Sequence, residues 1–213
     1  MTIIKLKNVS KSFNGNLLLD SVNLDIEKGK IYGVVGVNGS GKSVLFKLIC
    51  GFIFPDKGDV YVRDVKLGGG KNRFPENVGI IIDGSGFIPN KTGFENLKEL
   101  ALIRDIITDG KIKETMNMVG LDEKLKQKVK NYSLGMKQKL AIAQAIMEEQ
   151  DILVLDEPFN ALDEESTKTI RSLFIDLKNE GKTILITSHI KEDIQTLCDH
   201  VLKINSARLE FSK

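Results

Sequence analysis

One glycine-rich stretch constrains this chain more than any other part of its sequence. Residues 36–43 read GVNGSGKS and match the pattern GxxxxGK[ST]. In that pattern a turn directs its backbone N–H groups at a phosphate and leads into a helix whose N-terminus carries a partial positive charge. The sequence therefore predicts a nucleotide-phosphate site formed by Gly36, Val37, Asn38, Gly39, Ser40, Gly41, Lys42, Ser43 and Val44.

The segments on either side of this stretch fit the same interpretation. An apolar run, KIYGVVG, precedes it and is typical of a buried strand, and SVLFKLICG follows it with the apolar spacing of a helix. A strand, a phosphate-binding turn and a helix together indicate an α/β fold. We expect Lys42 to reach the β- and γ-phosphates and the hydroxyl of Ser43 to bind Mg²⁺.

Two adjacent acids end another apolar run, DILVLDEP at residues 151–158. Burying two neighbouring carboxylates is costly unless a cation compensates their charge. We expect Asp156 to hold Mg²⁺, directly or through water, and Glu157 to orient or deprotonate an attacking water. The alternative is that both acids cap the next turn.

Three further side chains are candidates for the same site. His189 closes the apolar run KTILITSH and would lie at a strand end near the γ-phosphate, although a structural role is the alternative. His200 has no such setting, and we expect it to be structural. Asp83 begins the loop DGSG after the apolar run VGIII, where strand ends of α/β sheets meet ligands, although a lone Asp is often a turn former. Phe13, between strand-like runs at 2–9 and 17–26, would stack on an adenine ring or fill the core.

From about residue 88 to residue 148 the apolar periodicity is helical, and we expect a helical insertion in the α/β core. Thr92 and Glu95 have the spacing of a capping box. A lysine-rich run, KLKQKVK at 124–130, predicts a solvated surface, with docking to an anionic surface or nucleic acid as the alternative. The helix that begins near Ser133 has a polar, glycine-containing first turn like a second anion site.

Composition limits the remaining possibilities. A net charge of +2 does not indicate a dominant nucleic-acid surface. The two cysteines, Cys50 and Cys198, fit no metal-ligand spacing, so we expect buried thiols in a reducing compartment. There is no signal-peptide pattern, and no apolar run approaches the roughly 20 residues that span a bilayer. We therefore expect an intracellular chain whose membrane role requires a partner.

Taken in order along the chain, these features resemble the ATP-binding subunit of ABC transporters, and the resemblance covers essentially the whole sequence. It implies a P-loop NTPase core with a mostly parallel sheet, an N-terminal antiparallel β subdomain and an inserted helical subdomain at about 88–148, within one domain of residues 1–213. It assigns adenine stacking to Phe13 and catalytic roles to Lys42, Glu157 and His189. The remaining matches are the Walker A motif at 36–43, the Walker B pair Asp156-Glu157 and the D-loop at 160–163.

Two departures from the family pattern stand out. The family usually has Gln where this chain has Asp83, a shorter charged group that would still bind Mg²⁺ or water. The family signature LSGGQ is replaced here by Tyr132-Ser133-Leu134-Gly135-Met136. Ser133, Leu134, Gly135 and Met136 would face the ATP of an opposing subunit. This variant resembles the branch that serves bacitracin- and lantibiotic-type export and immunity systems.

The resemblance implies an ATPase that powers a separate membrane permease, with ATP and Mg²⁺ as its ligands. The signature variant alone favours export over import. Two copies, or one copy and a similar subunit, would sandwich two ATP molecules on the inner face of the cell membrane. An alternative is a soluble ABC-type ATPase clamp that acts on ribosomes or DNA, which this single cassette without long heptads does not favour. A binding module that has lost hydrolysis is a third reading, and the presence of Lys42, Asp156, Glu157 and His189 argues against it.

Overall fold

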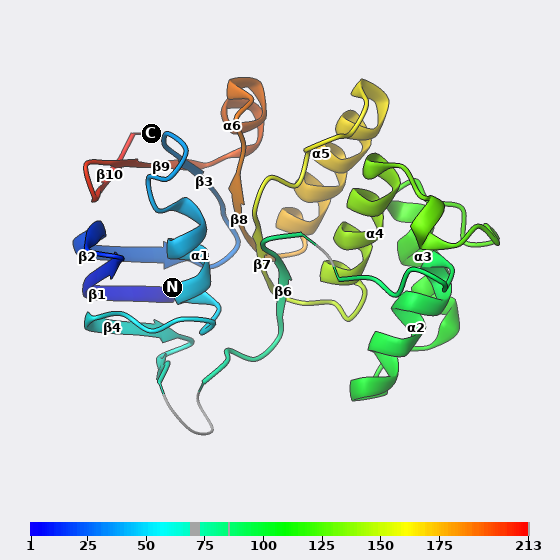
Figure 1. The fold of residues 1–213 in the computed structure, drawn as a ribbon, viewed down its shortest axis with the longest axis horizontal. Helices are drawn as coiled ribbons and strands as arrows, with labels where there is room; N and C mark the ends of the chain where they lie inside the picture. The colour runs from blue at the N-terminus through cyan, green and yellow to red at the C-terminus, as the bar shows by residue number, and fades with distance from the viewer. Residues whose placement is uncertain (69–72, 85, 213) are drawn as a thin grey trace.

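The computed structural model describes residues 1–68, 73–84 and 86–212 of the chain, so Ser85 of the loop that begins at Asp83 lies outside the described residues. Two sheets form the framework (Figure 1). The first is antiparallel, with the strand order β2-β1-β4-β5. Its strands are β1 (Thr2–Phe13), β2 (Asn16–Glu27), β4 (Lys57–Val62) and β5 (Val65–Lys66).

The second sheet has the order β10-β9-β3-β8-β7-β6 and is parallel except for the pairing of β9 with β10. Every residue of β7 and β8 is buried, as expected for parallel strands covered on both faces. The strands are β3 (Ile31–Val35), β6 (Val78–Ile81), β7 (Ile152–Leu155), β8 (Thr183–Thr187), β9 (His200–Asn205) and β10 (Arg208–Phe211).

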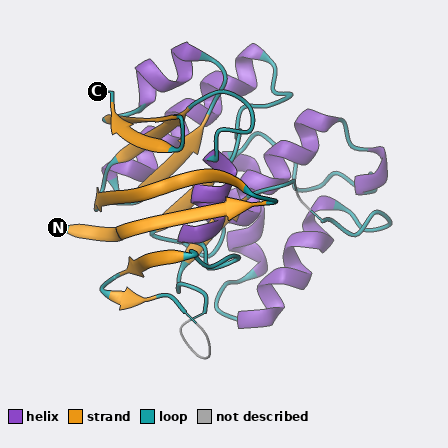
Figure 2. Cartoon of the chain, turned by 60° about the vertical axis from the view of Figure 1, so that its left-hand side comes forward, coloured by secondary structure: helices purple, strands orange, loops and turns teal. Residues whose placement is uncertain are grey.

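Helices cover both faces of this second sheet. Helix α1 (Lys42–Ile49) lies between the two sheets, and α4 (Leu134–Ile146) and α5 (Glu164–Asn179) lie on the other face (Figure 1). The strands gather toward one side of the molecule and most of the helices toward the other (Figure 2). The remaining helical segments are α2 (Gly93–Arg104), α3 (Asp109–Met118), a 3-10 turn at Val129–Asn131 and α6 (Lys191–Leu197).

Helices α2, α3 and α4 are inserted between β6 and β7, as the sequence predicts. Thr92 caps α2 with both hydrogen bonds of a capping box: its side chain accepts from the Glu95 N–H, and the Glu95 carboxylate accepts from the Thr92 N–H. Helix α4 packs closely on β6 because Gly79 has no side chain. A Cβ there would lie 1.9 Å from the carbonyl oxygen of Ala145.

The core consists of two apolar clusters, one on each face of the parallel sheet. One joins α1 to the antiparallel sheet, and the other joins the sheet to α2–α5. Cys50 and Cys198 are both buried, and burial raises the pKa of the Cys50 thiol to about 12, so that thiol stays protonated. Within the described residues, none of the helices has the length and apolar character needed to cross a membrane.

Candidate nucleotide-binding site

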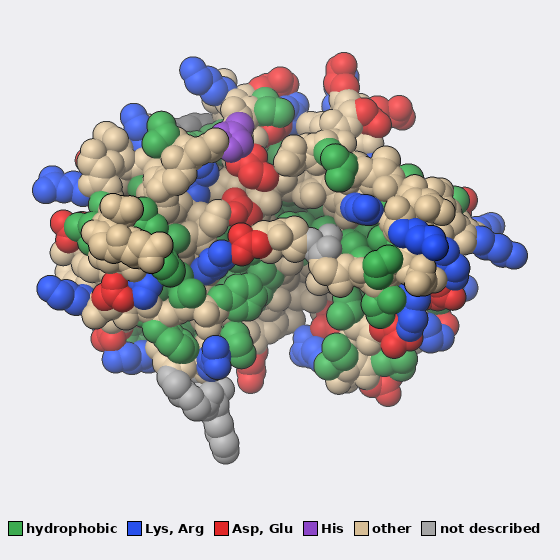
Figure 3. Space-filling model, in the orientation of Figure 1, with side chains coloured by type: hydrophobic (Ala, Val, Ile, Leu, Met, Phe, Trp, Pro, Cys, Tyr) green, Lys and Arg blue, Asp and Glu red, His purple; other side chains and the backbone are tan. Residues whose placement is uncertain are grey.

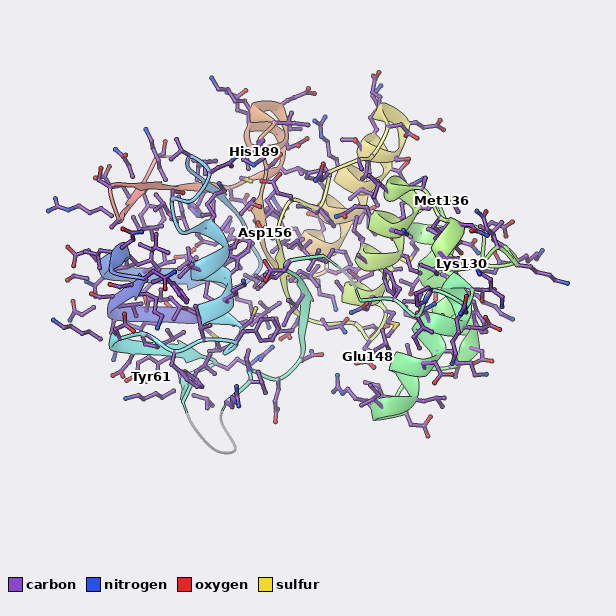
Figure 4. The ribbon with its side chains drawn as sticks, in the orientation of Figure 1. Tyr61, Lys130, Met136, Glu148, Asp156 and His189 are labelled. Carbon is purple, nitrogen blue, oxygen red and sulfur yellow. The ribbon has the colours of Figure 1, made fainter. Side chains whose placement is uncertain are left out.

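Three of the predicted site segments converge at one edge of the parallel sheet. The glycine-rich turn follows β3, Asp156 and Glu157 follow β7, and His189 follows β8, and these three strands are neighbours in the order β3-β8-β7. The carboxyl ends of parallel strands meet at the same edge, where ligands of α/β sheets bind. Asp156 and His189 accordingly line the same cavity, and His189 lies above Asp156 in Figure 4.

A cavity of about 340 Å³ opens at this edge. The turn around it requires glycine: Gly41 caps α1 with a φ of 106°, and a Cβ on Gly36 would lie 2.5 Å from the Ser40 hydroxyl oxygen. The Lys42 ammonium donates to the carbonyl oxygens of Gly36 at 2.9 Å and Val37 at 3.3 Å. Residues from the turn and from three other segments line the cavity: Leu18, Asn38, Gly39, Gly41, Lys42, Ser43, Val44, Asp156, Glu157 and His189.

The Asp156 carboxylate is held by two hydroxyl groups. It accepts hydrogen bonds from Ser43 Oγ at 2.5 Å and from Thr187 Oγ1 at 2.6 Å. The Thr187 oxygen also accepts from the backbone N–H of Glu157 at 2.8 Å, so this buried side chain connects β8 to both acids. Thr187 is not among the residues predicted from the sequence, although its place near the end of the apolar run KTILITSH, two residues before His189, puts it at the same sheet edge.

Glu157 and His189 form the outer part of the site. Glu157 Oε1 lies 3.2 Å from His189 Nε2, but the alignment does not make a hydrogen bond, and this buried oxygen has no hydrogen-bond partner in the described part of the chain. The buried Ser40 hydroxyl oxygen likewise has no hydrogen-bond partner among the described residues. Buried polar atoms are nearly always satisfied, so Glu157 Oε1 beside the cavity fits a site that takes a polar ligand or water.

Mg²⁺ prefers oxygen ligands, which include carboxylates, phosphate oxygens, water and the Ser or Thr hydroxyl of a phosphate-binding turn. Ser43 and Asp156 present both groups to one another at the cavity, which fits a magnesium ion. The described ranges contain no cluster of three or more His, Cys, Asp or Glu side chains that could hold a metal. A magnesium ion here would therefore need phosphate oxygens and water to complete its coordination.

Several predicted site residues lie outside this cavity lining: Gly36, Val37 and Ser40 of the glycine-rich turn, and also Phe13 and Asp83. Phe13 ends β1 rather than lying between the strands, and its side chain is 42% exposed with the Lys11 ammonium 5.3 Å from the ring centroid. Leu18 of β2 lines the cavity instead. Asp83 adopts a φ of 58° and pairs with Lys47 of α1 at 2.5 Å. Its carboxylate is thus engaged by a lysine in this structure.

The residues of the signature variant lie apart from the cavity of their own chain. Ser133 caps α4 by accepting from the Met136 N–H at 3.1 Å, and Leu134 is 72% exposed. Met136 lies on the opposite half of the molecule from His189 (Figure 4). From the next turn, the Gln138 side chain donates to the carbonyl oxygens of Glu157 and Pro158, a contact that the sequence reasoning did not identify.

Comparison with known proteins agrees with this geometry. Residues 19–160 match the family model described as ABC transporter. The chain is 42% identical to an uncharacterized ABC transporter ATP-binding protein, YybJ of Bacillus subtilis, over 99% of this chain and 96% of that protein. A bacitracin transport ATP-binding protein, BcrA of Enterococcus faecalis, is 37% identical over 92% of this chain, which spans 64% of BcrA.

A lantibiotic transport ATP-binding protein, SrtF of Streptococcus pyogenes, is 32% identical over 99% of this chain and 90% of that protein. The dimeric structure of MJ0796, a bacterial ABC transporter cassette, superposes with a TM-score of 0.86 at 28% identity and covers 98% of this chain and 97% of that one. The relatives confirm the bacitracin and lantibiotic resemblance, and the structural match confirms the expected fold class.

Replacing Thr187 by Val tests how the acids are held, because Val keeps the shape of the side chain and removes its hydroxyl. We expect the free energy of unfolding in urea to fall by about 1–3 kcal/mol, since the Glu157 N–H loses its partner. The same amide should exchange with solvent faster in Thr187→Val than in Thr187→Ser, which keeps the hydroxyl. Equal amide protection in the Val and Ser variants, measured by NMR, would contradict this account.

Proposed function

Because the chain belongs to the ABC transporter family and is an ATPase of that class, we propose that it powers a separate membrane permease, in the direction of export. The observation that carries this proposal is the cavity at the strand ends, where Ser43, Asp156 and Glu157 meet the glycine-rich turn. Bacitracin and lantibiotic transport proteins among its relatives support transport over a clamp on ribosomes or DNA. In this proposal residues 1–213 form one domain with a helical insertion at about 88–148, peripheral on the cytoplasmic face of the membrane.

The residues of the cavity take distinct roles in this reaction. Lys42 leaves the carbonyl oxygens of the turn to contact the β- and γ-phosphates, and the N-terminus of α1 faces the same anion. Bound Mg²⁺, held by Ser43 and Asp156, would neutralise the charge that develops on the phosphate oxygens. Glu157 accepts a proton from the attacking water, and His189 donates to the γ-phosphate.

Phe13 stacks on adenine after a rotation of its exposed ring, and Asp83 reaches water or Mg²⁺ only on leaving Lys47.

The signature variant completes the site across a subunit boundary. The exposed N-terminus of α4 presents the Ser133 hydroxyl and the N–H groups of Leu134 and Gly135 away from the cavity of its own chain, with Met136 beside them. We propose that these groups contact the γ-phosphate bound to a second copy, or to a similar subunit. The dimeric relative supports such an arrangement. Hydrolysis then removes a contact that both subunits share.

A groove of about 440 Å³ supports docking of the permease. Residues of β6, α2 and α4 line it, and it appears as a hollow between the two halves of the molecule (Figure 3). Ile103 on its rim is 76% exposed, and the Arg104 guanidinium pairs with the Glu148 carboxylate in its lining at 2.9 Å. We propose that a short amphipathic helix of the permease occupies the groove, its apolar side on Ile103 and its polar side on this ion pair.

Replacing Glu157 by Gln should separate binding from hydrolysis. We expect ATP affinity to remain, turnover to fall by about 100-fold or more through loss of the general base, and an ATP-bound dimer to accumulate. Phosphate release and light scattering measure these effects. Glu180→Gln, at the C-terminal end of α5, is the control and should turn over as the unaltered chain does. Unchanged phosphate release in Glu157→Gln would exclude Glu157 as the base.

Replacing Ile103 by Asp should weaken binding to the proposed permease while leaving ATP turnover of the isolated chain unchanged. A charge on the apolar rim is not compensated when the groove is covered. Leu102→Asp is the matched control, because Leu102 is 58% exposed on the same helix but does not line the groove. Co-purification of the co-expressed proteins measures the effect, and equal recovery with both variants would argue against this docking surface.

A further inference from the structure

A buried carboxylate lies beside the site and takes no part in the roles assigned above. Asp193 of α6 is 0% exposed. Its Oδ1 atom accepts hydrogen bonds from the Nε and Nη2 groups of Arg171, at 2.9 and 2.5 Å. Arg171 lies on α5 and also pairs with the exposed Glu192 at 2.9 Å. These contacts fix α6 to α5.

The second oxygen of this carboxylate leads to the histidine of the site. Asp193 Oδ2 accepts from Ser188 Oγ at 2.7 Å, and Ser188 Oγ accepts from the Ile190 N–H at 3.0 Å. The Ser188 hydroxyl therefore closes a turn around His189. On the other side of that turn, Thr187 is bound to Asp156 and to the Glu157 N–H.

This arrangement is a poor device for stability alone. A buried ion pair recovers little more than the cost of removing its charges from water, and apolar side chains of similar size often stabilise a core as well. What a buried, multiply bonded carboxylate does provide is a fixed geometry, because each of its oxygens has a defined partner. Here the fixed geometry is that of the turn that carries His189.

We propose that Arg171 and Asp193 are positioning residues for His189. Through Ser188 they hold the turn so that the imidazole remains beside Glu157 and within reach of the γ-phosphate. Helix α5 begins directly after the D-loop at 160–163, with Asp163 as its cap, so Arg171 also ties the histidine to the helix that follows this loop. This inference rests on the proposed function, in which His189 contacts the phosphate.

The test removes the Ser188 hydroxyl and restores it. A misplacement of 1 Å can cost a reaction about 100-fold in rate, and loss of one hydroxyl is a smaller disturbance. We therefore expect Ser188→Ala to lower kcat for ATP about tenfold and to change KM less than about twofold. Ser188→Thr keeps the hydroxyl and should recover most of kcat. Added to His189→Ala, Ser188→Ala should lower the residual kcat no further, because both changes act through the same imidazole.

A matched pair of α5 variants separates positioning from stability. Lys178 pairs with Asp199 at 2.9 Å and lies on the same helix, away from the histidine turn. Arg171→Met should lower kcat as Ser188→Ala does, whereas Lys178→Met should lower the unfolding temperature and keep kcat. A kcat of Ser188→Ala within twofold of the unaltered chain, or no recovery in Ser188→Thr, would overturn the inference alone. Absence of ATP turnover in the unaltered chain would overturn the proposed function as well.

Discussion

The site depends on the way the ends of parallel strands bring hydroxyl and carboxylate groups together. Asp156 leaves β7 between a hydroxyl from α1 and a hydroxyl from β8, and neither donor carries a charge. A carboxylate in such a setting is held in place but not neutralised, which suits a group that meets a cation only when nucleotide is bound. The glycine-rich turn needs the same convergence, because its N–H groups can surround a phosphate only if β3 and α1 are fixed on either side.

The rest of the molecule divides the work between two halves. The half that contains α1 and the sheets holds the cavity. The half that contains α2–α4 carries the exposed start of α4, which does not line that cavity. One chain thus carries the two parts of the proposed site without joining them. Gln138 connects the halves by donating to the carbonyl oxygens of Glu157 and Pro158. Asp83 connects the loop after β6 to α1 through its ion pair with Lys47.

Much of this could be predicted from the sequence, because local patterns determine it. The glycine-rich turn, the apolar runs ending in Asp156 and His189 and the capping box at Thr92 are each encoded within a few neighbouring residues. The contacts of Thr187, Gln138 and Arg171 could not be predicted, since they join segments that the chain brings together only on folding. Asp83 shows the same limit, because its lysine partner is 36 positions away and no spacing rule connects them.

Equilibrium binding of ATP in the presence of Mg²⁺, compared between the unaltered chain and Lys42→Ala, tests the central claim most directly. The account predicts saturable binding by the unaltered chain and a loss of at least about tenfold in affinity for the variant, since a charge-assisted contact to phosphate is removed. Failure of the unaltered chain to bind ATP, or equal affinity in the two proteins, would contradict it.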